Sequence, residues 1–270
     1  MIGSFTGGYL LNANVLRDKL KKGITCIGSA ISFGDATATE ALCNYLDFIW
    51  VDMEHVPFSL ETVQSHMMAT KGTQVAPLVR VPWNDPVLIK PVLDIGAAGV
   101  IAPMVCTADE AARLVSACLY PPQGIRGFGP RRPSNYGLSM TPEFCQEANA
   151  SIFPIAQIEH ATAVKNIDAI VAVPGIAAVM LGPFDLSGSM GYPAQPNHPK
   201  VIEAIDHVIA RAQKANVYVG MGVTDDPDSV RRWIDKGVSM LFIAPDYMLM
   251  LRAAKQFVDV IREQEKKRTR

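Results

Sequence analysis

Short apolar runs alternate with longer stretches of mixed apolar and polar residues along the whole chain. Each run holds four to seven residues rich in Val, Ile, Leu, Ala and Phe. That length and composition are typical of a parallel strand buried on both faces. Strands are predicted at residues 25–28, 48–52, 75–81, 99–102, 153–158, 177–181, 217–221 and 240–244.

The stretches between these runs place apolar residues at helical spacing, and several begin with residues that cap helices. Ser59 precedes one such stretch, and Asn84-Asp85-Pro86 combines a capping side chain with a proline in the first turn. Helices are predicted at residues 14–22, 39–45, 59–68, 84–93, 108–119, 161–171, 199–216, 228–236 and 246–263.

Strands and helices therefore alternate along the chain in eight units of about thirty residues each. This order predicts the α/β class and a single-domain (β/α)8 TIM barrel over residues 1–270, with a long C-terminal helix. An open, doubly wound sheet is the main alternative. It normally has fewer units, and no glycine-rich phosphate turn follows the first predicted strand.

Composition narrows the class of protein further. The 270 residues are 49% hydrophobic and 19% charged, with a formal net charge of −1, so no electrostatic field favours nucleic acid or an acidic membrane surface. No apolar run reaches the ~18 residues that a membrane span requires, and no signal sequence is apparent. The five cysteines contain no Cys-x-x-Cys pair and are expected to be reduced thiols in a cytoplasmic protein.

Ionisable and amide side chains follow several of the apolar strands, where a barrel would bring them to one open mouth. They are Asp52, Glu54, His55, Arg80, Gln157, Glu159 and Asp185. Each has a structural alternative, because a carboxylate at a strand end often caps the next helix and an arginine there often forms an ion pair in the barrel. The recurrence of such residues at successive strand ends favours a catalytic site.

Two of these carboxylates, Glu159 and Asp185, suit a hard divalent cation such as Mg²⁺ or Mn²⁺. A cation held by two carboxylates typically chelates the carboxylate and keto oxygens of a 2-oxo acid and stabilises its enolate. Formation of an enolate requires a base, and His55 is the best-placed histidine. Arg80 offers a planar donor fork for a carboxylate or oxyanion, and Gln157 can donate to the same group.

One long irregular segment, residues 120–141, has the aromatic and glycine content of an ordered active-site loop. It contains the pair Arg131-Arg132, for which two interpretations stand equal. The arginines either hold an acidic tail of the substrate or face solvent.

Several long motifs, in order along nearly the whole chain, resemble the HpcH/HpaI family of metal-dependent (class II) pyruvate aldolases. They are Asp52-Met53-Glu54-His55, Val79-Arg80-Val81-Pro82-Trp83-Asn84-Asp85-Pro86, Leu93-Asp94-Ile95-Gly96, Tyr120-Pro121-Pro122-Gln123-Gly124-Ile125-Arg126-Gly127, Gln157-Ile158-Glu159 and Gly182-Pro183-Phe184-Asp185-Leu186-Ser187. The resemblance implies that a 4-hydroxy-2-oxo acid is cleaved reversibly to pyruvate and an aldehyde.

The resemblance also implies roles for individual residues. His55 would be the general base, Arg80 would stabilise the transition state, and Glu159 and Asp185 would bind Mg²⁺, Mn²⁺ or Co²⁺. The pyruvyl part would contact Gln157, Phe184 and Asp185, the last two largely through backbone N–H groups at a helix start.

Asp94 matches a family acid that raises the basicity of the histidine. The predicted strands place Asp94 on the closed side of the barrel, so a boundary is misplaced, the contact is indirect, or it crosses a subunit interface. The family also implies a homohexamer, a trimer of dimers with exchanged C-terminal helices.

The chain departs from the family pattern at Val56-Pro57-Phe58-Ser59 and at Phe184, and both changes make the mouth bulkier and more apolar. The aldehyde is therefore left open. An oxaloacetate decarboxylase, or another carbon–carbon lyase or synthase using the same enolate, is the alternative enzyme. A non-catalytic barrel is disfavoured by the intact set of His55, Arg80, Glu159 and Asp185.

Overall fold

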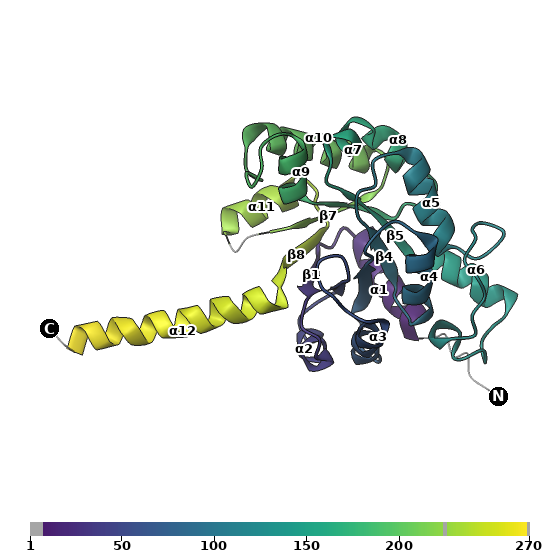
Figure 1. Ribbon diagram of the computed structural model, residues 1–270, viewed down its shortest axis with the longest axis horizontal. Helices are drawn as coiled ribbons and strands as arrows, with labels where there is room; N and C mark the ends of the chain where they lie inside the picture. Colours follow the sequence, from purple (N-terminus) through teal and green to yellow (C-terminus); the bar gives the residue numbers. More distant parts are fainter. Residues whose placement is uncertain (1–7, 224–225, 269–270) are drawn as a thin grey trace.

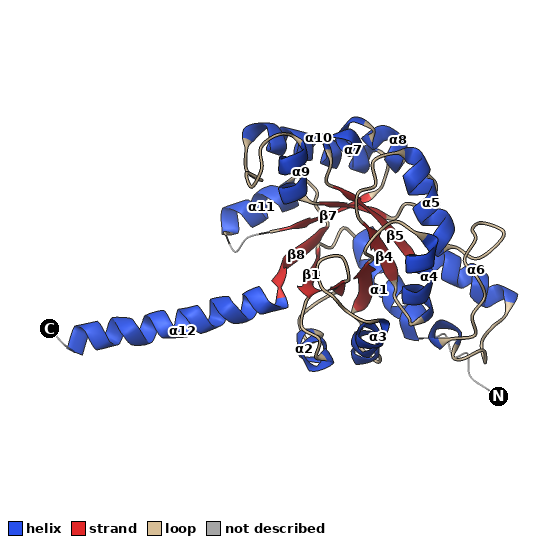
Figure 2. Cartoon of the chain, viewed as in Figure 1, coloured by secondary structure: helices blue, strands red, loops and turns tan. Residues whose placement is uncertain are grey.

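The computed structural model describes residues 8–223 and 226–268, and its eight strands form a closed, parallel barrel (Figures 1 and 2). Strands that follow one another in the chain are neighbours in the sheet, and β8 pairs with β1 to close it. The strands are β1 (Cys26–Ile31), β2 (Phe48–Asp52), β3 (Ala76–Arg80), β4 (Gly99–Ala102), β5 (Phe153–Ile158), β6 (Ala178–Leu181), β7 (Tyr218–Gly222) and β8 (Met240–Pro245). The predicted (β/α)8 barrel is confirmed.

Helices surround most of the barrel (Figure 2). They are α1 (Gly8–Lys21), α2 (Ala36–Leu42), α3 (Leu60–Ala69), α4 (Pro86–Asp94), α5 (Ala108–Cys118), η1, a 3-10 helix (Arg132–Ser134), α6 (Pro142–Ser151), α7 (Ala161–Lys165), α8 (Ile167–Val171), α9 (Pro183–Ser189), α10 (Pro199–Lys214), α11 (Pro227–Asp235) and α12 (Asp246–Arg268). The predicted caps are present: Ser59 accepts a hydrogen bond from the backbone N–H of Thr62, and Asp85 accepts one from that of Val87.

The strands turn alternate side chains to opposite faces, which divides the core in two. Phe48, Leu78 and Phe153 belong to a buried cluster inside the barrel, whereas Ile49 and Val79 pack outside against the helices. Space inside is tight, because a Cβ at Gly28 would lie 2.2 Å from the Phe48 ring. The residues that face into the barrel become polar toward the carboxyl ends of the strands, where the barrel opens.

The inward-facing row of β2 runs Phe48, Trp50, Asp52, and that of β3 runs Ala76, Leu78, Arg80. The register pairs the Cα atoms of Asp52 and Arg80 directly. The polar ends of neighbouring strands are therefore adjacent as a consequence of period-two alternation and register alone.

Several element boundaries differ from the prediction. β1 continues to Ile31 rather than ending at residue 28, since its apolar residues extend that far. The predicted helix at 161–171 is divided at Asn166, whose side-chain amide donates to the carbonyl of Cys106. Helix α6, which was not predicted, begins at a Thr141 cap that accepts from the Phe144 N–H.

The segment 120–141 was expected to be an active-site loop, and this expectation is wrong for the single chain. It follows α5 and lies at the amino-terminal end of the strands, where Arg132 Nε donates to the carbonyl of Ile95 at 3.0 Å. Ile95 follows α4, just ahead of β4. Neither Arg131 nor Arg132 therefore reaches the mouth of its own barrel.

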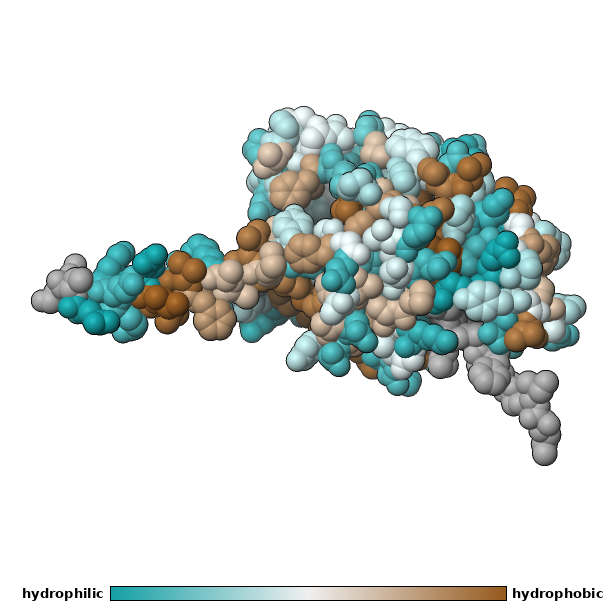
Figure 3. Space-filling model, turned by 60° about the horizontal axis from the view of Figure 1, so that its bottom comes forward, coloured by the Kyte–Doolittle hydropathy of each residue, from teal (hydrophilic) through white to brown (hydrophobic). Residues whose placement is uncertain are grey.

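Helix α12 leaves the barrel and extends away from it (Figure 1). Every described side chain from Met250 to Arg268 is exposed, and apolar side chains are visible along the helix in Figure 3. Ile27, on the outer face of β1, is 41% exposed. Among residues 8–223 and 226–268, no helix combines the length and apolarity needed to span a membrane.

Candidate active site

A cavity of about 360 Å³ opens at the carboxyl ends of the strands. Six of the residues singled out from the sequence line it: Asp52, His55, Arg80, Gln157, Phe184 and Asp185. Strand ends and the loops after them deliver catalytic groups in barrel enzymes. The structure therefore brings these six residues to one mouth.

Arg80 is buried and fixed by two carboxylates. Its Nε and Nη2 donate to the two Asp52 carboxylate oxygens at 2.9 and 2.7 Å, and its Nη1 lies 2.9 Å from Glu54 Oε2. The guanidinium carbon is also 4.7 Å from the centroid of the Trp50 ring, a cation–π distance. These contacts hold the donor fork in one orientation and leave N–H groups free for a ligand oxygen.

Asp52 also shapes the turn that carries the histidine. Its Oδ1 accepts from the backbone N–H groups of Glu54 at 3.0 Å and His55 at 3.4 Å. The His55 side chain is 63% exposed, and its Nε2 lies 3.9 Å from Glu54 Oε2. Burial raises the pKa of the Glu54 carboxyl, although the nearby Arg80 charge opposes that rise. One carboxylate thus orders both Arg80 and the His55 turn.

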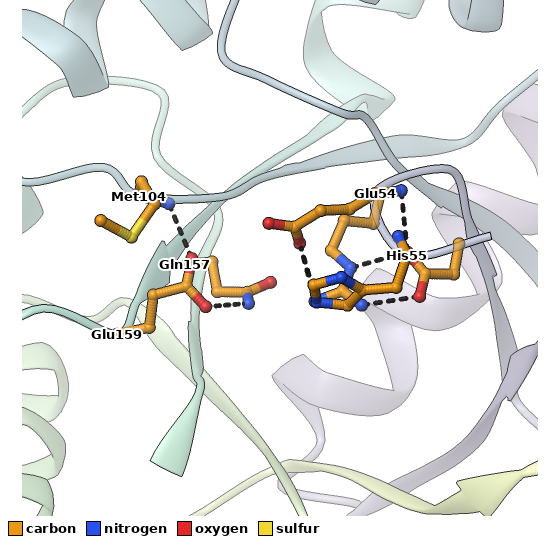
Figure 4. A network of polar contacts seen from close by, with 7 residues as sticks. Glu54, His55, Met104, Gln157 and Glu159 are labelled. Carbon is orange, nitrogen blue, oxygen red and sulfur yellow. Dashed lines mark hydrogen bonds and ion pairs between the residues drawn. The ribbon is translucent and has the colours of Figure 1, made fainter. Parts of the chain in front are cut away.

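Glu159 lies across the mouth from this turn, with Glu54 and His55 on one side and Gln157 and Glu159 on the other (Figure 4). Glu159 is 2% exposed. Its Oε1 accepts from the backbone N–H of Met104 at 2.8 Å, and its Oε2 accepts from Gln157 Nε2. Burial raises the pKa of Glu159, hydrogen bonds from Met104 and Gln157 lower it, and the Asp185 charge raises it again.

Met104 aims its N–H at Glu159 from a left-handed backbone conformation, with a φ of 55°. Such a conformation is uncommon for a residue with a side chain. On the opposite side, Gly182 allows α9 to begin close to Glu159, because a Cβ there would lie 2.7 Å from Glu159 Oε2. Backbone placed on both sides therefore sets the position of this carboxylate.

Oxygen atoms around Glu159 determine which metal ion the site could hold. In the described part of the chain, no group of three or more His, Cys, Asp or Glu side chains is arranged for a metal ion. Glu159 and Asp185 supply two carboxylates, and the buried Gln157 Oε1 beside them has no hydrogen-bond partner. Oxygen donors of this kind, with solvent and substrate oxygens completing the shell, fit Mg²⁺ or Mn²⁺ better than Zn²⁺.

Asp94 is not brought to this site within one chain. It ends α4, at the opposite end of the barrel from His55, and its Oδ1 lies 3.3 Å from Arg126 Nη2. The strand after Asp94 was predicted with the correct bounds, 99–102. A misplaced boundary therefore does not explain why Asp94 and His55 lie far apart in one chain.

Sequence reasoning included Asp52 and Glu54 among the residues at strand ends without giving them a role, and it did not single out Met104. On the adjacent strands β2 and β3, alternate side chains face into the barrel, and both Asp52 and Arg80 occupy inward-facing positions. Their contact could therefore have been predicted from the sequence pattern. Met104 contributes only a backbone N–H, and no side-chain pattern marks such a residue. Phe184 and Asp185 lie in the first turn of α9, and both are exposed.

The model of the family described as HpcH/HpaI aldolase/citrate lyase matches residues 32–253. A protein of Salmonella paratyphi C named 4-hydroxy-2-oxo-heptane-1,7-dioate aldolase is 35% identical over 243 residues, covering 90% of this chain and 92% of its own length. A Pseudomonas putida protein named 2-dehydro-3,6-dideoxy-6-sulfogluconate aldolase is 38% identical over 242 residues, covering 88% and 93%.

Solved structures agree with these sequence relatives. A crystal structure of an HpcH/HpaI aldolase/citrate lyase family protein from Burkholderia cenocepacia J2315 superposes with a TM-score of 0.86 at 32% identity. The match covers 92% of this chain and 99% of that one.

Proposed function

The chain belongs to the HpcH/HpaI aldolase/citrate lyase family and is an aldolase, and from this premise we propose that it cleaves a 4-hydroxy-2-oxo acid reversibly to pyruvate and an aldehyde. The observation that carries the proposal is the convergence of His55, Arg80 and Gln157 on one cavity, with Glu159 beside it. His55 supplies a base and Arg80 a guanidinium held in one orientation. Gln157 supplies an amide and Glu159 a buried carboxylate.

The reaction breaks the bond between C3 and C4 of the substrate. The proton of the 4-hydroxyl group leaves, C4 becomes the aldehyde carbon, and the bonding electron pair passes into the enolate of pyruvate. A proton then adds to C3 to give the methyl group of pyruvate. Condensation runs the same steps in reverse, so a single group that accepts and returns a proton serves both directions.

We assign the proton transfers to His55. Its side chain is exposed at the mouth, and its Nε2 lies 3.9 Å from Glu54 Oε2. Histidine exchanges protons most readily near neutral pH.

Arg80 and Gln157 have binding roles in the proposal. The Arg80 fork is oriented by Asp52 before the substrate arrives, so its remaining N–H groups stabilise developing negative charge without reorganisation. Gln157 is tied to Glu159 through its amide nitrogen and lies in the lining of the same cavity. The N–H groups in the first turn of α9, at Phe184 and Asp185, would receive the substrate carboxylate.

Glu159 and Asp185 would hold a divalent cation, which makes the enzyme class II. Mg²⁺, Mn²⁺ and Co²⁺ all accept such ligands, and the ion, when bound, polarises the substrate keto group as a Lewis acid. The Met104 N–H and the Gln157 amide hold Glu159 in place for this role.

The two curated relatives are named for substrates with a second acidic group, a heptane-1,7-dioate and a 6-sulfogluconate derivative. For this chain we propose only the shared part, the 4-hydroxy-2-oxo acid. We also propose a cytoplasmic location, since the five cysteines are all unpaired.

A homohexamer, arranged as a trimer of dimers, is part of the proposal. Helix α12 exposes apolar side chains along its length, and Ile27 is uncovered on the outside of the barrel. Exchange of α12 between chains would cover both surfaces. In such an assembly, Asp94 of one chain would approach His55 of another and raise its basicity.

The proposal is tested by following pyruvate release from a panel of 4-hydroxy-2-oxo acids and oxaloacetate. Each reaction is run with EDTA and after Mg²⁺, Mn²⁺ or Co²⁺ is added back. We expect cation-dependent release from at least one 4-hydroxy-2-oxo acid, together with an equal amount of aldehyde. Release from oxaloacetate alone would contradict the aldolase assignment and favour the decarboxylase.

A further inference from the structure

The cavity at the mouth has two chemically different ends. At the inner end, Trp50, Arg80 and Gln157 are each less than 9% exposed. At the outer end, Phe184 is 68% exposed and Tyr247 is 40% exposed, and both line the same cavity. The inner end holds the Arg80 and Gln157 side chains assigned to the pyruvyl part, so the substituent of the aldehyde extends toward the outer end, where the side chains of Phe184 and Tyr247 lie.

Positive charge is scarce in this cavity. Among the described residues that line it, only Arg80 and His55 carry or can gain a positive charge. Arg80 is engaged by Asp52 and Glu54, and His55 is assigned to the proton transfers. A second acidic group on the substrate would therefore meet no uncommitted cationic side chain among the residues of this chain that line the outer end.

Apolar surface is abundant at the outer end. Val56, Phe184 and Tyr247 come from three separate segments, namely the loop after β2, the first turn of α9 and the first turn of α12. Pro245 and Phe242 continue this lining along β8. Removing an apolar group from water against such residues is favourable.

The position of Tyr247 is set by its neighbour. Asp246 is 5% exposed, and its Oδ2 accepts from the backbone N–H groups of Ser32 and Phe33, both at 2.9 Å. These bonds tie the first turn of α12 to the loop after β1. Tyr247 is therefore held at the rim by a buried anchor rather than by the exposed remainder of α12.

We propose that the aldehyde partner of this enzyme carries an uncharged, apolar substituent, which packs against Val56, Phe184 and Tyr247. This inference rests on the proposed function, because it assigns the substituent of the same substrate. It makes the preferred substrate a 4-hydroxy-2-oxo monoacid with an apolar tail at C4.

The first experiment compares two aldehydes of similar length in condensation with pyruvate, pentanal and succinic semialdehyde. Product formation gives kcat/KM for each aldehyde under the same cation and pH. We expect pentanal to be preferred at least tenfold. Equal values, or a preference for succinic semialdehyde, would overturn the inference.

The second experiment introduces a positive charge at the outer end of the cavity. Tyr247→Arg should move the ratio of the two kcat/KM values at least tenfold toward succinic semialdehyde, relative to Tyr247→Gln. Both variants lose the aromatic ring and keep a long polar side chain, so their difference reports the charge. Identical ratios in the two variants would show that Tyr247 does not contact the substituent, and would also overturn the inference.

Exchange of the pyruvate methyl hydrogens with solvent deuterium separates this inference from the proposed function. Exchange requires the enolate but no aldehyde. Absence of exchange in the wild-type protein would overturn both proposals. Exchange accompanied by a preference for the acidic aldehyde would overturn only the apolar assignment.

Discussion

Asp52 shows how much of a site can follow from one position in a strand. It faces into the barrel because Phe48 and Trp50 do, and the register sets it beside Arg80. Both side chains are about one-tenth exposed, so neither charge is well solvated. Removing one partner of a buried ion pair leaves the other without compensation, which is more costly than losing a surface pair.

Asp52→Ala is therefore expected to lower the free energy of unfolding by about 3–5 kcal/mol, and to reduce kcat/KM because Arg80 loses its orientation. Urea denaturation and pyruvate release measure the two effects. Asp168→Ala is the control, because the ion pair of Asp168 with Arg211 is much more exposed and should contribute little to the free energy of unfolding. Equal losses of stability in the two variants would contradict the account.

Other residue-level features had no signal in the sequence. The N–H of Met104 reaches Glu159 only because the loop after β4 adopts a left-handed conformation at that residue. Residue type predicts a carboxylate at a strand end, but it does not predict which backbone groups will surround it. The location of polar residues at the strand ends was therefore predictable, whereas the contacts that position them were largely not.

At the scale of elements, strands were predicted better than the segments between them. A buried parallel strand leaves a continuous apolar run, and all eight runs correspond to strands of the barrel. Helix α6 was missed because it follows a segment rich in Gly and Pro, and the function expected of that segment was wrong. Gly and Pro content indicates a loop, but it does not indicate at which end of a barrel the loop lies.

Helix α12 carries an apolar stripe whose members recur at helical spacing. Met250, Phe257 and Ile261 are 54%, 72% and 57% exposed. A stripe of this kind on a long helix is typical of a surface that another chain covers. The sequence predicted the helix correctly, whereas its projection away from the barrel was expected only from the family resemblance.

Phe257→Asp is expected to dissociate the proposed hexamer, because it places a charge in the stripe. Gln256→Asp adds the same charge roughly 100° around the helix from Phe257, outside the line of Met250, Phe257 and Ile261, and should leave the assembly intact. Light scattering gives the molar mass of each variant. A wild-type protein that is monomeric, or two variants with the same mass, would contradict the exchange of α12.

At the scale of the whole molecule, the barrel brings together residues that are distant in the sequence. It also places residues that are close in the sequence at opposite ends of the strands. Arg80 and Glu159 share one mouth, whereas Asp94, which is closer to Arg80 in sequence, lies at the opposite end. A role of Asp94 in raising the basicity of His55 therefore requires a second chain.

Mixed assemblies test this requirement. His55→Ala and Asp94→Asn subunits should each assemble into nearly inactive enzyme. If each site takes His55 from one chain and Asp94 from another, unfolding and refolding the two together should restore about a quarter of the sites by random association. Refolding each variant alone is the control. Mixtures that remain as inactive as the separate variants would contradict a shared site.

The measurement that tests the central claim most directly is deuterium exchange at the methyl group of pyruvate, followed by NMR in the wild-type protein and in His55→Ala. We expect the wild-type exchange to stop with EDTA and return with Mn²⁺. His55→Ala should lose at least about 100-fold in rate while it still binds Mn²⁺ with wild-type affinity. Exchange in His55→Ala at the wild-type rate would contradict the assignment of His55 as the base.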